Sequence, residues 1–166
     1  KRNARVYAEI VGFGMSGDAF HMTAPDSEGA MRCMRTALTD AQINASDVSY
    51  INAHGTSTPV GDKNETVAIR HTFNSNINDL LISSTKSMTG HLLGGAGGLE
   101  SVLTVLSVFN DVVPPTINLE FPDEECNLDY CANEARDKKI NFALKNNFGF
   151  GGTNGSLIFK KIGVDL

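Results

Sequence analysis

The sequence predicts an α/β fold in which helices cover the faces of a mixed five-stranded sheet, in the order βαβαβα followed by an antiparallel hairpin. Apolar runs of strand length alternate along the chain with segments whose apolar residues recur at helical spacing. Two further apolar runs near the C-terminus are joined by a short glycine-rich connection, which favours an antiparallel pair. The 166 residues are 41% hydrophobic and 20% charged, which is typical of one globular domain.

The first strand is predicted over residues 6–13, where valine and isoleucine are frequent and a turn follows at 12–14 (GFG). The first helix is predicted to begin near residues 25–28 (PDSE), because acidic residues suit the positive end of the helix dipole. The same alternation continues with a strand at 47–53, a helix at 62–73 and a strand at 80–84.

The third helix, at 95–109, is apolar on most sides, which indicates burial in the centre of a larger body. Pro114 and Pro115 are expected to end it. Residues 116–139 are polar and irregular, so we expect a surface excursion there. The last predicted elements are the two hairpin strands, at 139–146 and 155–160, and a tail at 162–166.

Composition limits the classes of partner. The 14 basic and 19 acidic residues give a formal net charge of −5, which argues against a general affinity for nucleic acid or an anionic membrane. The apolar stretches fall well short of the roughly 20 residues that span a bilayer, and no secretory signal is visible. Cys33, Cys126 and Cys131 form no CxxC pair, which favours a reducing, cytoplasmic setting. None has a neighbouring histidine or lysine signature, so we expect no nucleophile among them.

His54 follows the predicted strand at 47–53, within the sequence NAHGTSTP. Ligands collect at the ends of parallel strands in α/β sheets, so the position makes His54 a candidate site residue. Gly55 offers backbone access, and the hydroxyl groups of Thr56 and Thr58 can hydrogen-bond a polar ligand. The alternative is a histidine that only hydrogen-bonds within its own loop.

Lys86 and His91 follow the next predicted strand, five positions apart in SSTKSMTGH. Both side chains can point into one corner between a loop and a helix. A lysine at such a position is commonly a solvated surface residue, but the glycines around His91 predict a tightly packed backbone here. Burial of that kind tunes the pKa values of lysine and histidine for chemistry.

Two imidazoles near one point suit hydrogen-bond donation to a carbonyl oxygen that becomes an enolate. A zinc site with Asp62 or Glu100 is the rival interpretation, but no HExxH motif or compact ligand spacing occurs, so we expect no metal. The sequence GFGMSG at 12–17 matches the dinucleotide pattern GxGxxG. No helix signal follows those glycines directly, so nucleotide binding is not expected.

Three motifs occur in order along the chain: NAHGTSTPVGD at 52–62, STKSMTGH at 84–91 and NFGFGGTN at 147–154. Together they resemble the C-terminal half of β-ketoacyl-[acyl-carrier-protein] synthases I and II, and the residues of the motifs are more similar to synthase II. The resemblance covers residues 5–161. It implies a thiolase-like fold, in which two similar halves pack into one layered body, and it makes residues 1–161 the C-terminal half.

The resemblance also implies roles for single residues. His54 and His91 would bind the malonyl thioester carbonyl and stabilise the enolate, and Lys86 would hold the histidine network and its charge state. Glu100 and Asp62 would belong to the supporting polar network. The residues implied in substrate contacts are Thr56 and Thr58 at the phosphopantetheine arm, Phe148 and Phe150 at the gate and oxyanion hole, and His21 and Thr23 near the entrance for the acyl carrier.

The implied reaction is fatty-acid chain elongation by decarboxylative Claisen condensation of malonyl-acyl-carrier-protein with an acyl-enzyme, without a metal or organic cofactor. The implied partners are acyl carrier protein, the N-terminal half of the same enzyme and a second copy in a homodimer. In this family the nucleophilic cysteine belongs to the N-terminal half. The chain alone is therefore expected to be inactive and to expose its apolar helix.

Two alternatives stay open: a non-catalytic subunit of the chain-length-factor type, and a ketosynthase domain of a polyketide synthase. Both histidines and Lys86 argue against the first, whereas the second also uses two histidines. A thiolase is disfavoured by the motif at 147–154, and the branch with an asparagine in place of one histidine is disfavoured by His91.

Overall fold

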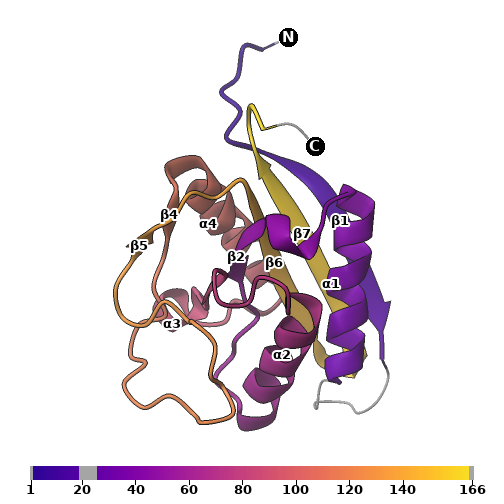
Figure 1. Cartoon of the computed structure of the whole chain (residues 1–166), viewed down its shortest axis with the longest axis vertical. Helices are drawn as coiled ribbons and strands as arrows, with labels where there is room; N and C mark the ends of the chain where they lie inside the picture. The colour runs from indigo at the N-terminus through magenta and orange to yellow at the C-terminus, as the bar shows by residue number, and fades with distance from the viewer. Residues whose placement is uncertain (1, 19–25, 165–166) are drawn as a thin grey trace.

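The computed structural model describes residues 2–18 and 26–164, and it confirms the predicted mixed five-stranded sheet. The positions of His21 and Thr23 lie outside the described residues. The sheet consists of β1 (Ala8–Gly17), β2 (Val48–Asn52), β3 (Leu81–Ser83), β6 (Phe142–Gly149) and β7 (Thr153–Lys161). Its spatial order is β1, β7, β6, β2, β3 (Figure 1). β7 is antiparallel to both β1 and β6, whereas β6, β2 and β3 run parallel.

Helices cover both faces of this sheet. α1 (Ser27–Ala41) and α2 (Pro59–Thr72) lie in front of it in Figure 1, and α4 (Ala96–Asn110) lies behind. The side chains of β6 alternate between the two faces, with Leu144 in the core below α1 and α2 and Ala143 in the core on the α4 side. The predicted helix start at 25–28 is confirmed, because the Asp26 side chain caps α1 by accepting a hydrogen bond from the Glu28 N–H.

The apolar face of α4 is only partly covered. Val102 and Leu106 are 56% and 41% exposed, which agrees with the expected exposure of this helix in the chain alone. On the same side of the sheet, Phe13 and Met15 of β1 are 52% and 65% exposed. No helix in the described ranges is long and apolar enough to cross a membrane.

The turn predicted at 12–14 is wrong, because β1 continues through it to Gly17. The glycines serve helix packing instead. A Cβ at Gly14 would lie 2.0 Å from the Cys33 carbonyl oxygen, and one at Gly12 would lie 2.5 Å from the Ala37 carbonyl oxygen. Glycine therefore allows the backbone of α1 to pack directly on the strand.

Replacing Gly14 by alanine should destabilise the protein, because the clash is with helix backbone that cannot move alone. We expect a loss of about 1–3 kcal/mol in the free energy of unfolding, measured by urea denaturation. Gly17→Ala is the matched control in the same strand, since an added Cβ there meets nothing within 4 Å. Equal stabilities of the two variants would contradict this account of the packing.

Three local features differ from the expectation. α4 ends before Pro114, because Asp111 adopts the left-handed conformation with φ 57° and stops the helix. The excursion at 116–139 contains a strand, β5 (Arg136–Asp137), which pairs with β4 (Val112–Val113). A short helix, α3 (Lys86–Thr89), follows β3. The described residues also form short 3-10 turns at Ala45–Asp47, Leu93–Gly95 and Phe150–Gly152.

Candidate functional site

The candidate site lies where β2 and β3 end side by side. The two strands pair in parallel, so the loops that carry His54 and Lys86 leave the sheet at the same edge. The Ala53 N–H donates to the Ser83 carbonyl oxygen at 2.9 Å and holds the two loops together. The structure thus brings together the two motifs that the sequence singles out.

A buried carboxylate fixes the backbone of the His54 loop. The two oxygens of Glu65, which is 5% exposed, accept hydrogen bonds from the His54 N–H at 2.9 Å and the Gly55 N–H at 2.8 Å. From the other side, Ser84 Oγ donates to the Gly55 carbonyl oxygen at 2.6 Å. Burial raises the pKa of Glu65, whereas the N–H donors favour its charged form. The loop therefore presents the imidazole of His54 in a fixed position.

Glu65→Gln should loosen this loop and destabilise the protein. Glutamine has one acceptor oxygen, so one of the two backbone N–H groups loses its partner. We expect a loss of about 1–3 kcal/mol in the free energy of unfolding, measured by urea denaturation. Glu124→Gln, at an exposed position, is the control and should leave stability unchanged. A Glu65→Gln protein as stable as the control would show that the loop does not depend on this carboxylate.

The imidazoles of His54 and His91 face each other at this edge. Their ring centroids are 5.5 Å apart, and the ring planes meet at 85°. Phe148 also packs against His54, with 5.9 Å between ring centroids. His91 is exposed in this chain, whereas His54 is half-buried, so a ligand can reach the space beside the two rings.

Both rings can donate a hydrogen bond without carrying a charge. His91 Nδ1 accepts a hydrogen bond from the Leu93 N–H at 3.1 Å, which puts the ring proton on Nε2. Burial, and then the positive charges of Lys86 and Lys145, lower the pKa of His54 to about 3. At neutral pH the imidazole of His54 is therefore uncharged, and the Nε2–H of His91 is a second donor beside it, an arrangement that suits a developing oxyanion.

A buried ion cluster lies behind the histidines. Glu100 of α4 is 1% exposed and bridges two lysines, with its Oε1 2.6 Å from Lys86 Nζ and its Oε2 2.7 Å from Lys145 Nζ. The predicted neighbourhood of Lys86 and Glu100 is thus present, and Lys145 of β6 is an addition that the sequence analysis missed. The signal was a lysine within the otherwise buried strand FALKNNFG (142–149), where a charge indicates a dedicated partner.

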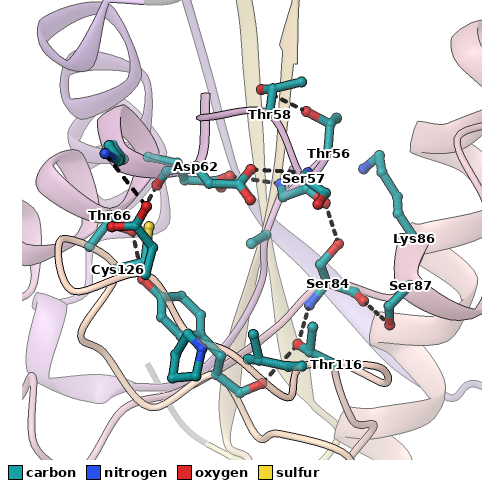
Figure 2. Close-up of a pocket in the computed structure, with 18 of the residues that line it drawn as sticks. Thr56, Ser57, Thr58, Asp62, Thr66, Ser84, Lys86, Ser87, Thr116 and Cys126 are labelled. Carbon is teal, nitrogen blue, oxygen red and sulfur yellow. Dashed lines mark hydrogen bonds and ion pairs between the residues drawn. The ribbon is translucent and has the colours of Figure 1, made fainter. Parts of the chain in front are cut away.

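Two of the predicted substrate-contact residues, Thr56 and Thr58, border a cavity together with Asp62. The cavity has a volume of about 520 Å³ and lies between the His54 loop and residues 116–130 (Figure 2). The hydroxyl groups of Thr56 and Thr58 lie 3.4 Å apart, and Asp62 Oδ1 accepts a hydrogen bond from the Ser57 N–H at 3.2 Å. Lys86 reaches the same cavity from α3. This space is large enough for an extended, flexible ligand.

Phe148 and Phe150 differ in their surroundings. Phe148 is 7% exposed and packs beside His54, whereas Phe150 is 80% exposed in the turn between β6 and β7. The sharp turn is made by Gly151 and Gly152, whose φ angles of 74° and 73° favour glycine. The side chain of Phe150 is therefore open to solvent in this chain.

The expected tight glycine packing around His91 is wrong. An added Cβ at Gly90, Gly94 or Gly98 would meet nothing within 4 Å. Lys86 is nevertheless buried, because Glu100 supplies its counter-charge. Gly97 is different, because a Cβ added there would lie 2.6 Å from Asn147 Nδ2.

Metal ligands and reactive thiols do not gather at this edge. Among residues 2–18 and 26–164, no group of three or more His, Cys, Asp or Glu side chains is placed to hold a metal ion. The three cysteines are free thiols. Burial raises the pKa of Cys33 and of Cys126, so neither has the character of an activated nucleophile.

Comparison with known proteins gives the relationship directly. The sequence matches the family described as "Beta-ketoacyl synthase, C-terminal domain" over residues 7–120. It is 57% identical over 164 residues to 3-oxoacyl-[acyl-carrier-protein] synthase 2 of Coxiella burnetii (strain RSA 493 / Nine Mile phase I), with 98% of this chain and 40% of that protein covered. The chain thus spans about two-fifths of the length of this curated relative.

Solved structures of related proteins show the same relationship. A β-ketoacyl synthase from Burkholderia phymatum STM815 superposes with a TM-score of 0.92 and 44% identity over 97% of this chain and 39% of that chain. A structure of a type II polyketide synthase acyl-carrier protein in complex with its ketosynthase superposes with a TM-score of 0.93 and 40% identity, over 97% of this chain and 40% of that chain. Because the matched family domain covers more than half of the sequence, the chain belongs to the β-ketoacyl synthase family and corresponds to its C-terminal domain.

Proposed function

We propose that this chain supplies the decarboxylating part of the active site of a β-ketoacyl-[acyl-carrier-protein] synthase that elongates fatty acids. The observation that carries the proposal is the pair of imidazoles 5.5 Å apart at the ends of β2 and β3. Burial and nearby lysines keep His54 an uncharged donor, and the Leu93 N–H on Nδ1 of His91 leaves its Nε2–H free to donate. The relationship to 3-oxoacyl-[acyl-carrier-protein] synthase 2 supports the same reaction.

The proposed chemistry uses the two rings as an oxyanion hole. The thioester carbonyl oxygen of malonyl-carrier-protein accepts hydrogen bonds from His54 and His91. The bond between the α-carbon and the carboxylate then breaks, carbon dioxide leaves, and the electron pair forms an enolate whose negative oxygen the two N–H groups stabilise. The enolate carbon attacks the acyl thioester on the nucleophilic cysteine, a carbon–carbon bond forms, and the cysteine leaves as thiolate.

The other residues have supporting roles in this proposal. Glu100 holds the ammonium group of Lys86 in place through their ion pair, and Asp62 holds the loop at Ser57. Thr56 and Thr58 contact the phosphopantetheine arm, for which the adjacent cavity of about 520 Å³ provides room. Phe148 packs on His54, and the exposed Phe150 gates the acyl site.

The nucleophilic cysteine comes from an N-terminal portion that packs on the α4 side. The exposed apolar residues Val102, Leu106, Phe13 and Met15 support this placement. We expect the 166 residues alone to be inactive and to associate or aggregate. The other proposed partners are acyl carrier protein and a second copy of the enzyme, and the free thiols fit a reducing, cytoplasmic setting. A stable, monodisperse monomer of these residues in analytical ultracentrifugation would count against the proposal.

The reaction should need no metal ion or organic cofactor, since side chains of the protein stabilise the enolate. The full-length protein, incubated with malonyl-carrier-protein and an acyl-carrier-protein primer, should release carbon dioxide and form the β-ketoacyl product. Both rates should be the same with and without EDTA. A protein that released no carbon dioxide, or that lost the reaction in EDTA and recovered it with zinc, would overturn the proposal.

A polyketide ketosynthase is a second candidate, because the polyketide ketosynthase complex superposes at a TM-score of 0.93. Product analysis separates the two. Fatty-acid elongation gives one condensation per primer when no reductase is present, whereas a polyketide ketosynthase gives poly-β-keto chains.

A further inference from the structure

Lys145 is a buried ammonium group that the proposed chemistry does not use directly. Its side chain is 1% exposed, and it points from β6 to the α4 side of the sheet, where Glu100 lies. Its Nζ lies 2.7 Å from Glu100 Oε2 in an ion pair, and it donates to the Asn146 carbonyl oxygen and to Asn147 Oδ1 at 3.1 Å. A carboxylate oxygen and two further oxygens therefore surround the ammonium group, so the site is suited to a charged lysine.

The charge of the cluster depends on Lys145. Lys86 and Glu100 form an ion pair of zero net charge, and Lys145 adds one positive charge, so the three groups together carry +1. Two ammonium groups sharing one carboxylate are costly in a dry interior. A neutral side chain at residue 145 would avoid this loss of stability. The presence of a charged side chain there therefore indicates a functional role.

We propose that Lys145 is a positioning residue of the condensing site, whose ammonium gives the buried Lys86–Glu100–Lys145 cluster its net positive charge and so keeps His54 an uncharged hydrogen-bond donor. This inference rests on the proposed function, and it extends that function to a residue outside the three motifs. The same charge favours the enolate over the neutral thioester, because the negative charge develops next to His54.

Lys145 acts on His54 through its charge and is linked to it through Asn147. The positive charge of Lys145 lowers the pKa of His54, after burial and the charge of Lys86. The Asn147 side chain accepts a hydrogen bond from Lys145 at 3.1 Å, and it acts on His54 in the opposite direction by raising the pKa of that ring. Gly97 leaves room for this amide, since a Cβ there would lie 2.6 Å from Asn147 Nδ2.

The groups around Lys145 set its own titration. Burial lowers the pKa of Lys145 to about 8, with Lys86 of α3 acting in the same direction, while Glu100 of α4 and Glu65 of α2 raise it. Tyr50 of β2 also faces Glu100, and burial raises its pKa. As pH rises through about 8, Lys145 loses its proton, and the cluster loses its net positive charge.

The test compares the full-length wild-type protein with Lys145→Met, which keeps the length of the side chain and removes the charge. The kcat for malonyl decarboxylation should fall about 10- to 100-fold with KM little changed. The wild-type rate should decline above pH 8, and this decline should be absent from Lys145→Met. NMR of labelled histidine should show His54 protonating at higher pH in the variant. Lys139→Met, at an exposed position, should behave like wild type.

A double variant separates charge from packing. In the variant that combines Lys145→Met with Glu100→Gln, Lys86 alone carries charge, so the cluster again has a charge of +1. The decarboxylation activity should therefore recover relative to Lys145→Met. Thermal melting checks that both variants are folded. An active wild type whose Lys145→Met variant keeps kcat, pH profile and His54 titration would overturn the inference alone. A wild type with no decarboxylation would overturn the proposed function, although the His54 titration would still report whether the Lys145 charge reaches the ring.

Discussion

His54→Ala and His91→Ala should each abolish malonyl decarboxylation by the full-length protein. Each change removes one of two N–H donors to the enolate oxygen, and loss of one such donor costs about 100- to 1,000-fold in kcat. The two rings are 5.5 Å apart and act on the same oxygen, so the double variant should be little worse than either single one. The measurement is release of labelled carbon dioxide from malonyl-carrier-protein at saturating substrate.

His71→Ala is the matched control for these variants. His71 lies exposed in the last turn of α2, away from the site, so this change should leave the rate unaltered. Near-UV circular dichroism should confirm that all the variants are folded. Decarboxylation retained by either His54→Ala or His91→Ala would refute the assigned roles.

Glu100→Ala should cause the largest loss of stability of any single change at the site. It removes the carboxylate that both Lys86 and Lys145 contact, and it leaves two buried ammonium groups close to each other. Breaking a buried ion pair by removing one partner costs about 3–5 kcal/mol in the free energy of unfolding. Urea denaturation of the full-length protein gives the value.

Glu120→Ala removes an exposed carboxylate and serves as the control, with a change expected within about 0.5 kcal/mol. Adding Lys145→Met to Glu100→Ala should recover part of the loss, because one of the two unpaired charges is gone. A Glu100→Ala protein as stable as the control would contradict this account, because it would mean that the two lysines are neutral or solvated rather than buried and charged.

The architecture could be predicted because each main element has a local signal. Apolar runs marked the strands, and the Asp26 cap marked the start of α1. The errors arose where glycine has two uses. Gly12 and Gly14 suggested a turn, but they allow α1 to pack on β1, and that requirement depends on a helix about 20 residues away in the sequence.

The candidate site was predictable only in part. His54, Lys86 and His91 follow strands that end at one edge, so their positions in the sequence indicated a shared site. Glu65 and Lys145 were missed because their importance comes from tertiary contacts. Glu65 lies within α2 and reaches back to the backbone at His54, and Lys145 meets Glu100 only because α4 crosses behind β6.

The central claim is that one substrate oxygen is held by both imidazoles. It is tested most directly by a crystal structure of the full-length protein with a non-hydrolysable malonyl-pantetheine analogue. We predict that the carbonyl oxygen next to the malonyl carbon lies about 3 Å from Nε2 of both His54 and His91, with no metal ion between them. A carbonyl oxygen bound away from the two rings, or a metal ion held by them, would contradict the account.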